Sequence, residues 1–230
     1  MKKIISLLVF GCVCSFALGQ GTTESLVVKY KHSMKIPVSV NQNASDNIEQ
    51  SADFTLMYSD GKSLYSGDKQ AKTETMVSGM RVDVGMPEEI TYKDFGSKTV
   101  VTQTDFFDKK FLITKNMIDN EWIITNEQKT IAGYSCTKAT NSIGDVIWFS
   151  NEIPVPDGPI VFCGAPGLIL EVVSRMGTTT AVSILKSKNT PKMDPPAEGK
   201  RVTEAEFMEI VRKRMEANGV KQGGLNVEIR

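Results

Sequence analysis

The sequence predicts a mainly β protein, with a single curved antiparallel sheet or half-barrel and a C-terminal α-helix packed on it (α+β). Two observations predict this fold class. Apolar and polar residues alternate over many short runs that are separated by turn signals, which is the period of half-buried strands. A clear helical period appears only once, after residue 203. About ten strands joined by short turns indicate one antiparallel meander.

The first strands are marked by alternation and by a hairpin signal. Apolar residues alternate around Val28 and again around Leu56, and Asp60-Gly61 follows the second run directly. An Asp-Gly pair between alternating runs favours a tight hairpin. The same alternation predicts further strands at Glu89–Phe95, Lys98–Phe106, Lys110–Lys115, Trp122–Asn126, Thr130–Thr140, Val146–Ser150, Leu168–Ser174 and Thr178–Lys186.

Two stretches interrupt the strand pattern. Residues 38–52 are polar and are interpreted as a loop, whereas residues 187–202 contain three prolines and predict an extended connector. The resulting organisation is a signal segment at 1–19, a β-sheet domain at 20–186, the connector, a helix at 203–218 and a tail at 219–230.

The C-terminal helix has both a start signal and an apolar face. Thr203 and Glu206 form a capping box, in which each residue's side chain can satisfy the other's backbone N–H. Apolar residues then recur at helical spacing, and we expect them to cover one face of the sheet; they are Phe207, Ile210, Val211 and Met215. The adjacent run Arg212–Arg214 is interpreted as a solvated face.

The N-terminus has the anatomy of a secretory signal. Lys2 and Lys3 precede a short apolar segment, and Ala17-Leu18-Gly19 offers small residues at a cleavage site. Cleavage after Gly19 predicts an exported protein, either periplasmic or associated with the outer membrane. The competing interpretation is a lipoprotein with Cys12 or Cys14 as the lipidated residue. The bulky Phe10 disfavours Cys12, and Val13, directly before Cys14, disfavours Cys14.

Export leaves two cysteines, Cys136 and Cys163, in an oxidising compartment. We therefore expect a disulfide between them. The bond would close a loop of 28 residues and stabilise the fold by about 3.5 kcal/mol. The alternative is a pair of buried thiols.

The search for catalytic chemistry excludes several classes of site. Basic and acidic residues both number 27, so the chain lacks the basic excess typical of nucleic-acid binding. The single histidine, His32, excludes sites that need two imidazoles, and its alternating context predicts an ordinary strand residue. No zincin, nucleophile-elbow or phosphate-loop motif occurs. The methionines are interpreted as apolar filling of the core. Since no catalytic motif is found, we expect no catalytic residues, metal or cofactor.

One turn stands out from the generic strand pattern. Gly164-Ala165-Pro166-Gly167-Leu168-Ile169 combines a proline, which fixes φ, with two glycines, which permit unusual backbone geometry. The turn would feed Leu168 and Ile169 into a strand buried on both faces. It is either a structural corner or the mouth of an apolar cavity.

This segment resembles the motif of the GLPGLI family, with Ala165 in place of the usual leucine. The likeness extends to Ile131–Ala139, to Val146–Phe149 and to the Gly158-Pro159 turn. The resemblance implies an exported protein of Gram-negative bacteria, often encoded beside outer-membrane transport receptors. It carries over no catalytic residues.

These expectations combine into a functional hypothesis. The leading one is a non-enzymatic, exported envelope binding protein that holds an apolar small molecule or peptide in the concavity of the half-barrel. The first alternative is an accessory interaction protein that docks on an outer-membrane transport receptor. The second is an enzyme with an unrecognised carboxylate site. No nucleic-acid partner is expected.

Overall fold

The computed structural model describes residues 25–41, 44–67, 73–77, 80–84, 89–118, 121–189 and 192–217. The expected signal segment at 1–19, including Cys12 and Cys14, lies outside these residues, as does the tail at 219–230. Within the described part of the chain, no helix is long and apolar enough to cross a membrane.

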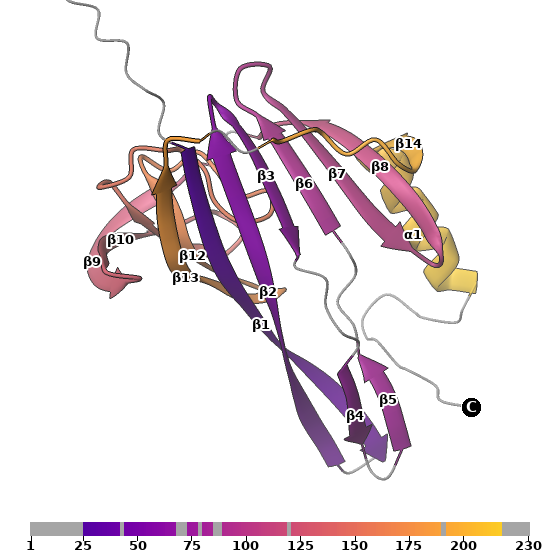
Figure 1. Ribbon diagram of the computed structural model, residues 1–230. Coiled ribbons are helices and arrows are strands. Elements are labelled where there is room, and N and C mark those ends of the chain that lie inside the picture. Colours follow the sequence, from indigo (N-terminus) through magenta and orange to yellow (C-terminus); the bar gives the residue numbers. More distant parts are fainter. Residues whose placement is uncertain are drawn as a thin grey trace, which may run out of the picture.

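Twelve strands form one curved sheet, which confirms the predicted fold class (Figure 1). The spatial order is β14-β8-β7-β6-β3-β2-β1-β13-β12-β11-β10-β9, and β4 pairs separately with β5. The strands are β1 (Ser25–Asn41), β2 (Ala44–Ser59), β3 (Lys62–Gly67), β4 (Thr73–Val77), β5 (Met80–Val84), β6 (Glu89–Asp94), β7 (Thr99–Phe106), β8 (Lys109–Asn116), β9 (Ile123–Ile131), β10 (Tyr134–Thr140), β11 (Val146–Ser150), β12 (Leu168–Ser174), β13 (Gly177–Ser187) and β14 (Lys200–Thr203), and the helix is α1 (Glu204–Ala217).

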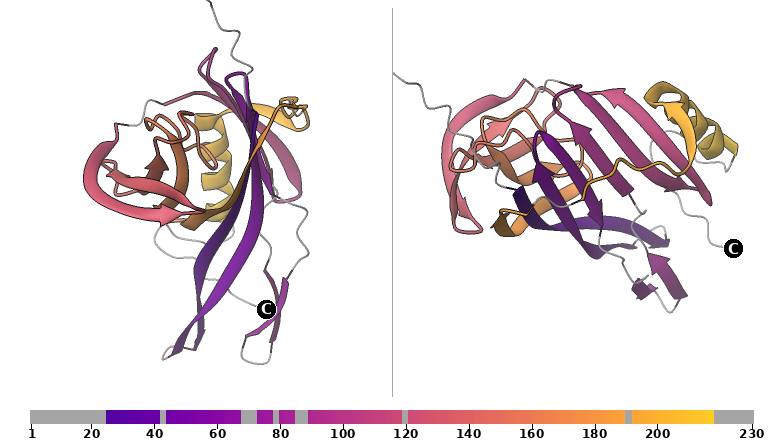
Figure 2. Two further views of the ribbon diagram at one scale, coloured as in Figure 1. Left: turned by 60° about the vertical axis from the view of Figure 1, so that its left-hand side comes forward. Right: turned by 45° about the horizontal axis from the view of Figure 1, so that its top comes forward.

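The sheet consists of two antiparallel meanders. One runs from β1 to β8, with β4 and β5 outside it, and the other runs from β9 to β13. They join where β1 pairs with β13, so the chain crosses from one edge of the sheet to the other between β8 and β9. The sheet is open and curved, so that β9–β13 and the helix lie on the same side of β1–β3 (Figure 2).

Two local predictions need correction. Within the polar stretch 38–52, residues 38–41 and 44–52 are paired strand rather than loop, because β1 and β2 continue as a long hairpin in which Ile36 pairs with Ile48 and Ser39 with Ser45. Backbone pairing therefore extends the hairpin well past its apolar positions. The single strand expected at Thr130–Thr140 is divided by a tight turn at Ala132-Gly133, where φ is 48° and 86°.

The connector ends in a strand that the sequence did not reveal. Lys200–Thr203 forms β14, which pairs in parallel with Phe111–Thr114 of β8 at the edge of the sheet. The Glu198 N–H also donates a hydrogen bond to Gln103 Oε1 over 3.3 Å. The connector is therefore fixed to the sheet before the helix begins, so the helix starts from an anchored position.

Helix α1 begins at Glu204 as the capping box predicts. The Thr203 N–H donates to Glu206 Oε2 over 2.7 Å, and the Glu206 N–H donates to Thr203 Oγ1 over 3.2 Å. Phe207 and Ile210 pack against Phe111 of β8 and Val202 of β14. None of the helix residues is buried, so the helix covers its end of the sheet only loosely.

The main core lies on the inner face of β1–β3 and β10–β13. The chain between β11 and β12, residues 151–167, folds onto this face and fills it with Ile153 and Ala165. The Leu168 N–H donates to the Ile153 carbonyl over 2.9 Å, and the Tyr30 hydroxyl donates to the Ile169 carbonyl over 2.7 Å. This part of the concavity is therefore occupied by the protein itself.

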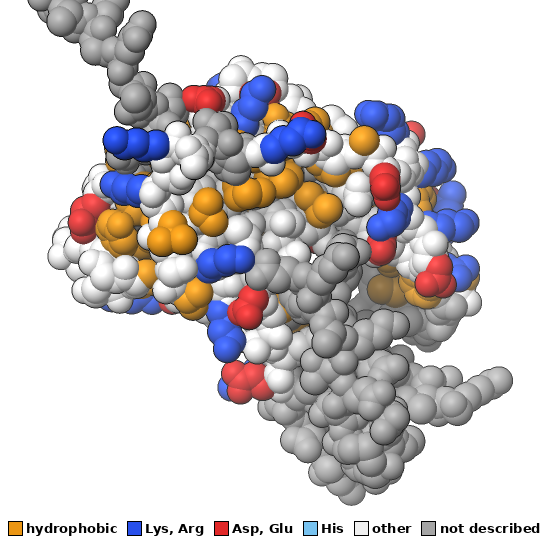
Figure 3. Space-filling view, viewed as in Figure 1, with side chains coloured by type: hydrophobic (Ala, Val, Ile, Leu, Met, Phe, Trp, Pro, Cys, Tyr) orange, Lys and Arg blue, Asp and Glu red, His pale blue; other side chains and the backbone are white. Residues whose placement is uncertain are grey.

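The outer face carries an apolar row at the junction of the meanders. Leu185 pairs with Val27, Val27 with Met57, and Met57 with Leu64, so four neighbouring strands contribute one side chain each. Figure 3 shows hydrophobic side chains as a band across this face, with basic residues beside it. Leu185 is the most open member of the row, at 62% exposed.

Candidate functional site

The structure fits the structural-corner interpretation of the Gly164–Ile169 turn. Gly164 has a φ of 85°, in the left-handed region that favours glycine. Gly167 packs so closely on the preceding strand that an added Cβ would overlap the Ser150 carbonyl oxygen. Leu168 and Ile169 then enter β12 completely buried, and Pro166 lies exposed on the outside of the turn. The glycines serve backbone geometry and close packing.

The predicted disulfide is not formed. Cys136 and Cys163 are both buried thiols, and they occupy different surroundings. Cys136 packs in the larger core cluster, where burial raises the pKa of its thiol to about 11. Cys163 lies in the segment on the inner face, with its backbone bridged to Asp157 and its carbonyl bonded by Trp122 Nε1. A thiol with so high a pKa is a poor nucleophile.

Sequence reasoning missed a fully buried ion pair under the same segment. Lys93 of β6 and Asp157 both have completely buried side chains and form an ion pair. Lys93 Nζ also donates to the carbonyls of Gly158 and Phe162, over 2.6 and 3.5 Å. Asp157 Oδ1 accepts the Gly158 N–H over 2.8 Å, whereas Oδ2 has no hydrogen-bond partner among the described residues. The pair attaches the segment to the sheet.

This pair acts on its neighbours but is closed to solvent. The pKa of the Tyr30 hydroxyl is raised, first by burial and then by the negative charge of Asp157. With both partners of the ion pair fully buried, a substrate has no direct access to either charge. The sequence predicted a strand at Glu89–Phe95, but local alternation gives no sign of the distant partner that Lys93 meets.

The other titratable candidates are also structural. His32 lies on β1 as expected, its Nδ1 is 2.8 Å from Thr179 Oγ1, and burial lowers its pKa. Burial raises the pKa of Glu89, which accepts a hydrogen bond from Thr91 Oγ1 over 3.3 Å. Across the described ranges, His, Cys, Asp and Glu side chains form no group of three or more that could hold a metal ion.

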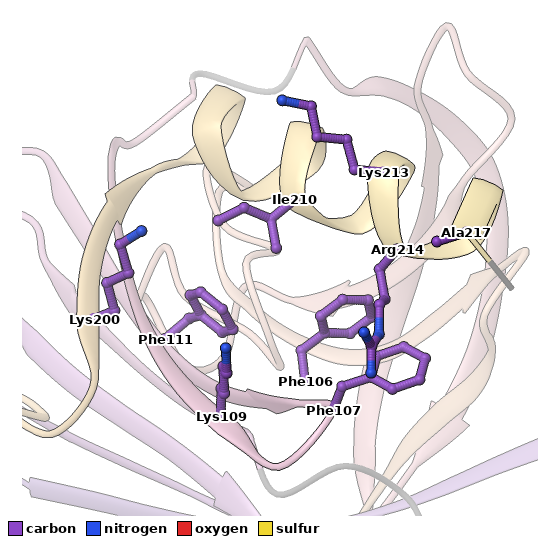
Figure 4. Close-up of a pocket in the computed structure, with 9 residues that line it drawn as sticks. All are labelled: Phe106, Phe107, Lys109, Phe111, Lys200, Ile210, Lys213, Arg214 and Ala217. Atoms are coloured by element: carbon purple, nitrogen blue, oxygen red, sulfur yellow. The ribbon is translucent and has the colours of Figure 1, made fainter.

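One feature with the geometry of a binding site is a groove between α1 and the β7–β8 hairpin (Figure 4). Its volume is about 450 Å³. Five lining residues are apolar and four are basic: Phe106, Phe107, Phe111, Ile210 and Ala217, with Lys109, Lys200, Lys213 and Arg214. We call this feature the aromatic–basic groove.

A strained turn holds one aromatic ring of the groove in solvent. Phe107 and Asp108 connect β7 to β8, and both have positive φ, at 48° and 59°. A two-residue turn of this kind normally contains Asn and Gly, because bulky residues are disfavoured in the left-handed region. Phe107 is nevertheless there and is 47% exposed. Strain that persists at an exposed aromatic residue is typical of functional positions.

Aromatic contacts and cations together shape the groove. Phe106 contacts Phe107 with ring centroids 4.8 Å apart, and Phe207 of the helix contacts Phe111 at 5.3 Å. The Arg214 guanidinium lies over the Phe107 ring at 4.6 Å. Chemically, such a groove can hold a ligand that offers a flat apolar face together with negative charge.

All three residues of the basic run Arg212–Arg214 are exposed, as expected, and two of them also line the groove. Arg212 bonds Glu209 and Glu216 on the exposed side of the helix. Lys213 and Arg214 instead line the groove, and Lys213 lies 3.4 Å from Glu209. Helical spacing alone did not reveal this division, because the β7–β8 turn is what brings an aromatic ring to Arg214.

Comparison with known proteins identifies the family. The family described as "N-glycanase peptide, N-terminal domain" matches residues 38–205. Two solved structures of PNGF-II, in space groups C2 and P21, share the fold with TM-scores of 0.55 and identities of 17% and 18%. Each match covers 83% of this chain but only 33% and 34% of the PNGF-II chains, so this chain spans about a third of their length. No curated protein matches it.

These findings correct two expectations. The assignment to the GLPGLI family is wrong, because a short Gly-Pro turn into a buried strand reports local backbone geometry rather than ancestry. The expectation of an apolar carrier is wrong as well: the matched family is glycanase-associated, and residues 151–167 fill the main core face. Docking on a transport receptor loses its basis, since it rested on the GLPGLI resemblance. With residues 38–205 matched, the chain belongs to the family of N-glycanase peptide N-terminal domains.

Proposed function

We propose that this chain is the substrate-recognition module of an N-glycanase, and that it binds the glycan of a glycoprotein in the aromatic–basic groove. The family match over residues 38–205 is the observation that carries the proposal. The matched PNGF-II chains are about three times longer than the part that this chain covers. The reaction would then reside on a separate module, and this chain would carry no reaction of its own.

The composition of the groove supports glycan binding. Phe107 is an exposed aromatic ring, and the face of such a ring has a negative charge density that attracts the C–H bonds of a sugar. Phe106 and Phe111 extend the apolar surface beside it. A groove of about 450 Å³ falls in the size range of small-molecule sites and is large enough for one or two sugar rings.

The expected compartment agrees with this role. A signal segment at residues 1–19 would export the chain, and exposed glycoproteins are substrates met outside the cytoplasm. We therefore propose that the module works in the periplasm or at the outer membrane.

The direct test is binding to a matched pair of proteins. A glycoprotein that carries a single N-glycan, and the same protein after removal of that glycan, would be titrated into residues 20–230 by calorimetry. We expect binding only to the glycosylated form, with a loss of at least tenfold in Phe107→Ala. Leu185→Ala, on the outer face, is the control and should bind normally. Equal binding to both forms, or to neither, would contradict the proposal.

A further inference from the structure

We infer that the aromatic–basic groove selects an acidic sugar, one that carries a carboxylate or a sulfate on its ring. This inference deepens the proposed function and rests on it. The starting observation is the charge of the lining: four of its nine residues are Lys or Arg, and none is Asp or Glu. The whole chain, by contrast, has 27 basic and 27 acidic residues. The groove is therefore a local concentration of positive charge.

The four cations come from three separate elements, and the charged groups of two of them, Lys109 and Arg214, lie at the aromatic rings. Lys109 belongs to β8, Lys200 to β14, and Lys213 and Arg214 to α1. In Figure 4 the Lys109 ammonium group lies beside the Phe111 ring and points toward the helix. A cation held at a concave apolar surface strengthens the local positive potential, because the protein around it excludes water. The Lys213 ammonium group points away from the rings and lies 3.4 Å from Glu209, so it contributes least.

Two of the nearby acidic groups form ion pairs on the outside of the groove. Lys213 shares Glu209 with Arg212, and Glu209 lies on the exposed side of the helix, outside the groove. Asp105 forms its ion pair with Lys110, which is not a lining residue. A neutral sugar would use the aromatic rings alone, whereas an oxyanion on the sugar would also make charge-assisted hydrogen bonds to the cations.

Carboxylates and sulfates share the chemistry that the groove requires. A carboxylate is a planar oxyanion and a sulfate is a tetrahedral one, and both accept several hydrogen bonds from Lys and Arg. A sialylated sugar and a sulfated sugar are therefore two sources of one ligand chemistry. The order of their affinities would show which source the groove prefers.

The experiment compares three saccharides on one scaffold: lactose, 3′-sialyllactose and lactose 3′-sulfate. Each is titrated into residues 20–230 at 20 and 200 mM NaCl. We expect at least one of the acidic sugars to bind tenfold or more tightly than lactose, and this preference to shrink at the higher salt concentration. The double variant Lys109→Gln/Lys200→Gln should lose the preference while keeping the weak lactose binding. Lys62→Gln, an exposed lysine on β3, is the matched control.

The outcomes separate this inference from the proposed function. Equal binding of lactose and both acidic sugars, lost in Phe107→Ala, would overturn the acidic-sugar inference but leave a glycan-binding module. A glutamate-rich peptide that bound as tightly as the acidic sugars would also overturn it and assign the groove to acidic peptides. If none of the three saccharides bound and the glycoprotein of the preceding experiment also failed to bind, both proposals would be wrong.

Discussion

The two ends of the inner face are covered in different ways. Over β1–β3 and β10–β13, residues 151–167 lie flat on the sheet and are held by backbone hydrogen bonds, by two core clusters and by the buried Lys93–Asp157 pair. Over β8 and β14, helix α1 is held chiefly by Phe207 and Ile210, and none of its residues is buried. One end is closed by packed side chains, whereas the other leaves a groove of about 450 Å³.

The difference separates the stable core from the proposed recognition site. Segments with many buried contacts open only with the whole domain, whereas weakly packed elements open at a lower free-energy cost. The covering segment 151–167 therefore belongs to the stable core, and the helix is the part that can adjust to a ligand. Four substitutions test this contrast.

Lys93→Met should destabilise the protein most, by about 3 to 5 kcal/mol, because it leaves the Asp157 carboxylate buried without its partner. Urea unfolding followed by circular dichroism measures the loss. The double variant Lys93→Met/Asp157→Leu should recover most of it, since no unpaired charge remains. If Lys93→Met unfolded at the wild-type urea concentration, the pair would not hold the segment to the sheet.

Gly167→Ala should cost about 1 to 3 kcal/mol, because the added methyl group overlaps the Ser150 carbonyl oxygen in a tightly packed corner. The cause is close approach, since Gly167 is not among the residues with positive φ. Gly144→Ala is the matched control: Gly144 has a φ of 90° and open space around it, so it isolates the backbone strain. Equal losses of unfolding free energy in the two variants would remove the argument from close packing.

Thr203→Ala should weaken only the helix, by about 1 kcal/mol, because it removes the side-chain cap of the Glu206 N–H. Hydrogen exchange should accelerate in α1 and stay unchanged in β1–β3 and β10–β13. Thr203→Ser keeps the hydroxyl and should behave almost as the wild type. Faster exchange across the whole sheet would mean that the helix and the core unfold together, and it would contradict the lower free-energy cost of opening the helix.

Glu89→Gln should have the smallest effect, and the effect should depend on pH. Burial raises the pKa of Glu89 above 4.5, so the folded state binds its proton more tightly than the unfolded chain does. Stability is consequently lost as the pH rises from the unfolded pKa through the folded one. The variant should be slightly more stable than wild type at pH 7 and equal to it near pH 4, as measured by thermal unfolding. A larger gain at pH 4 than at pH 7 would contradict this sign.

Local sequence signals predicted the fold well. Alternation around Val28 and Leu56 places these residues on the inner face, and the Thr203–Glu206 box starts the helix where expected. Such signals work because strand period and helix caps depend on residues a few positions apart. The stretch 38–52 failed the same test, since its pairing comes from the partner strand of the hairpin and not from its own apolar residues.

Local signals in the amino-acid sequence predicted the mainly β class, most strands of the two meanders, the C-terminal helix and the turn at Gly164–Ile169. Tertiary structure decided the rest. Lys93 meets Asp157 only because residues 151–167 fold back onto β6, and the groove exists only because β14 places the helix over the β7–β8 turn. The same packing keeps Cys136 and Cys163 as separate thiols. Contacts between distant residues depend on how the whole chain closes, and local periodicity carries no record of that closure.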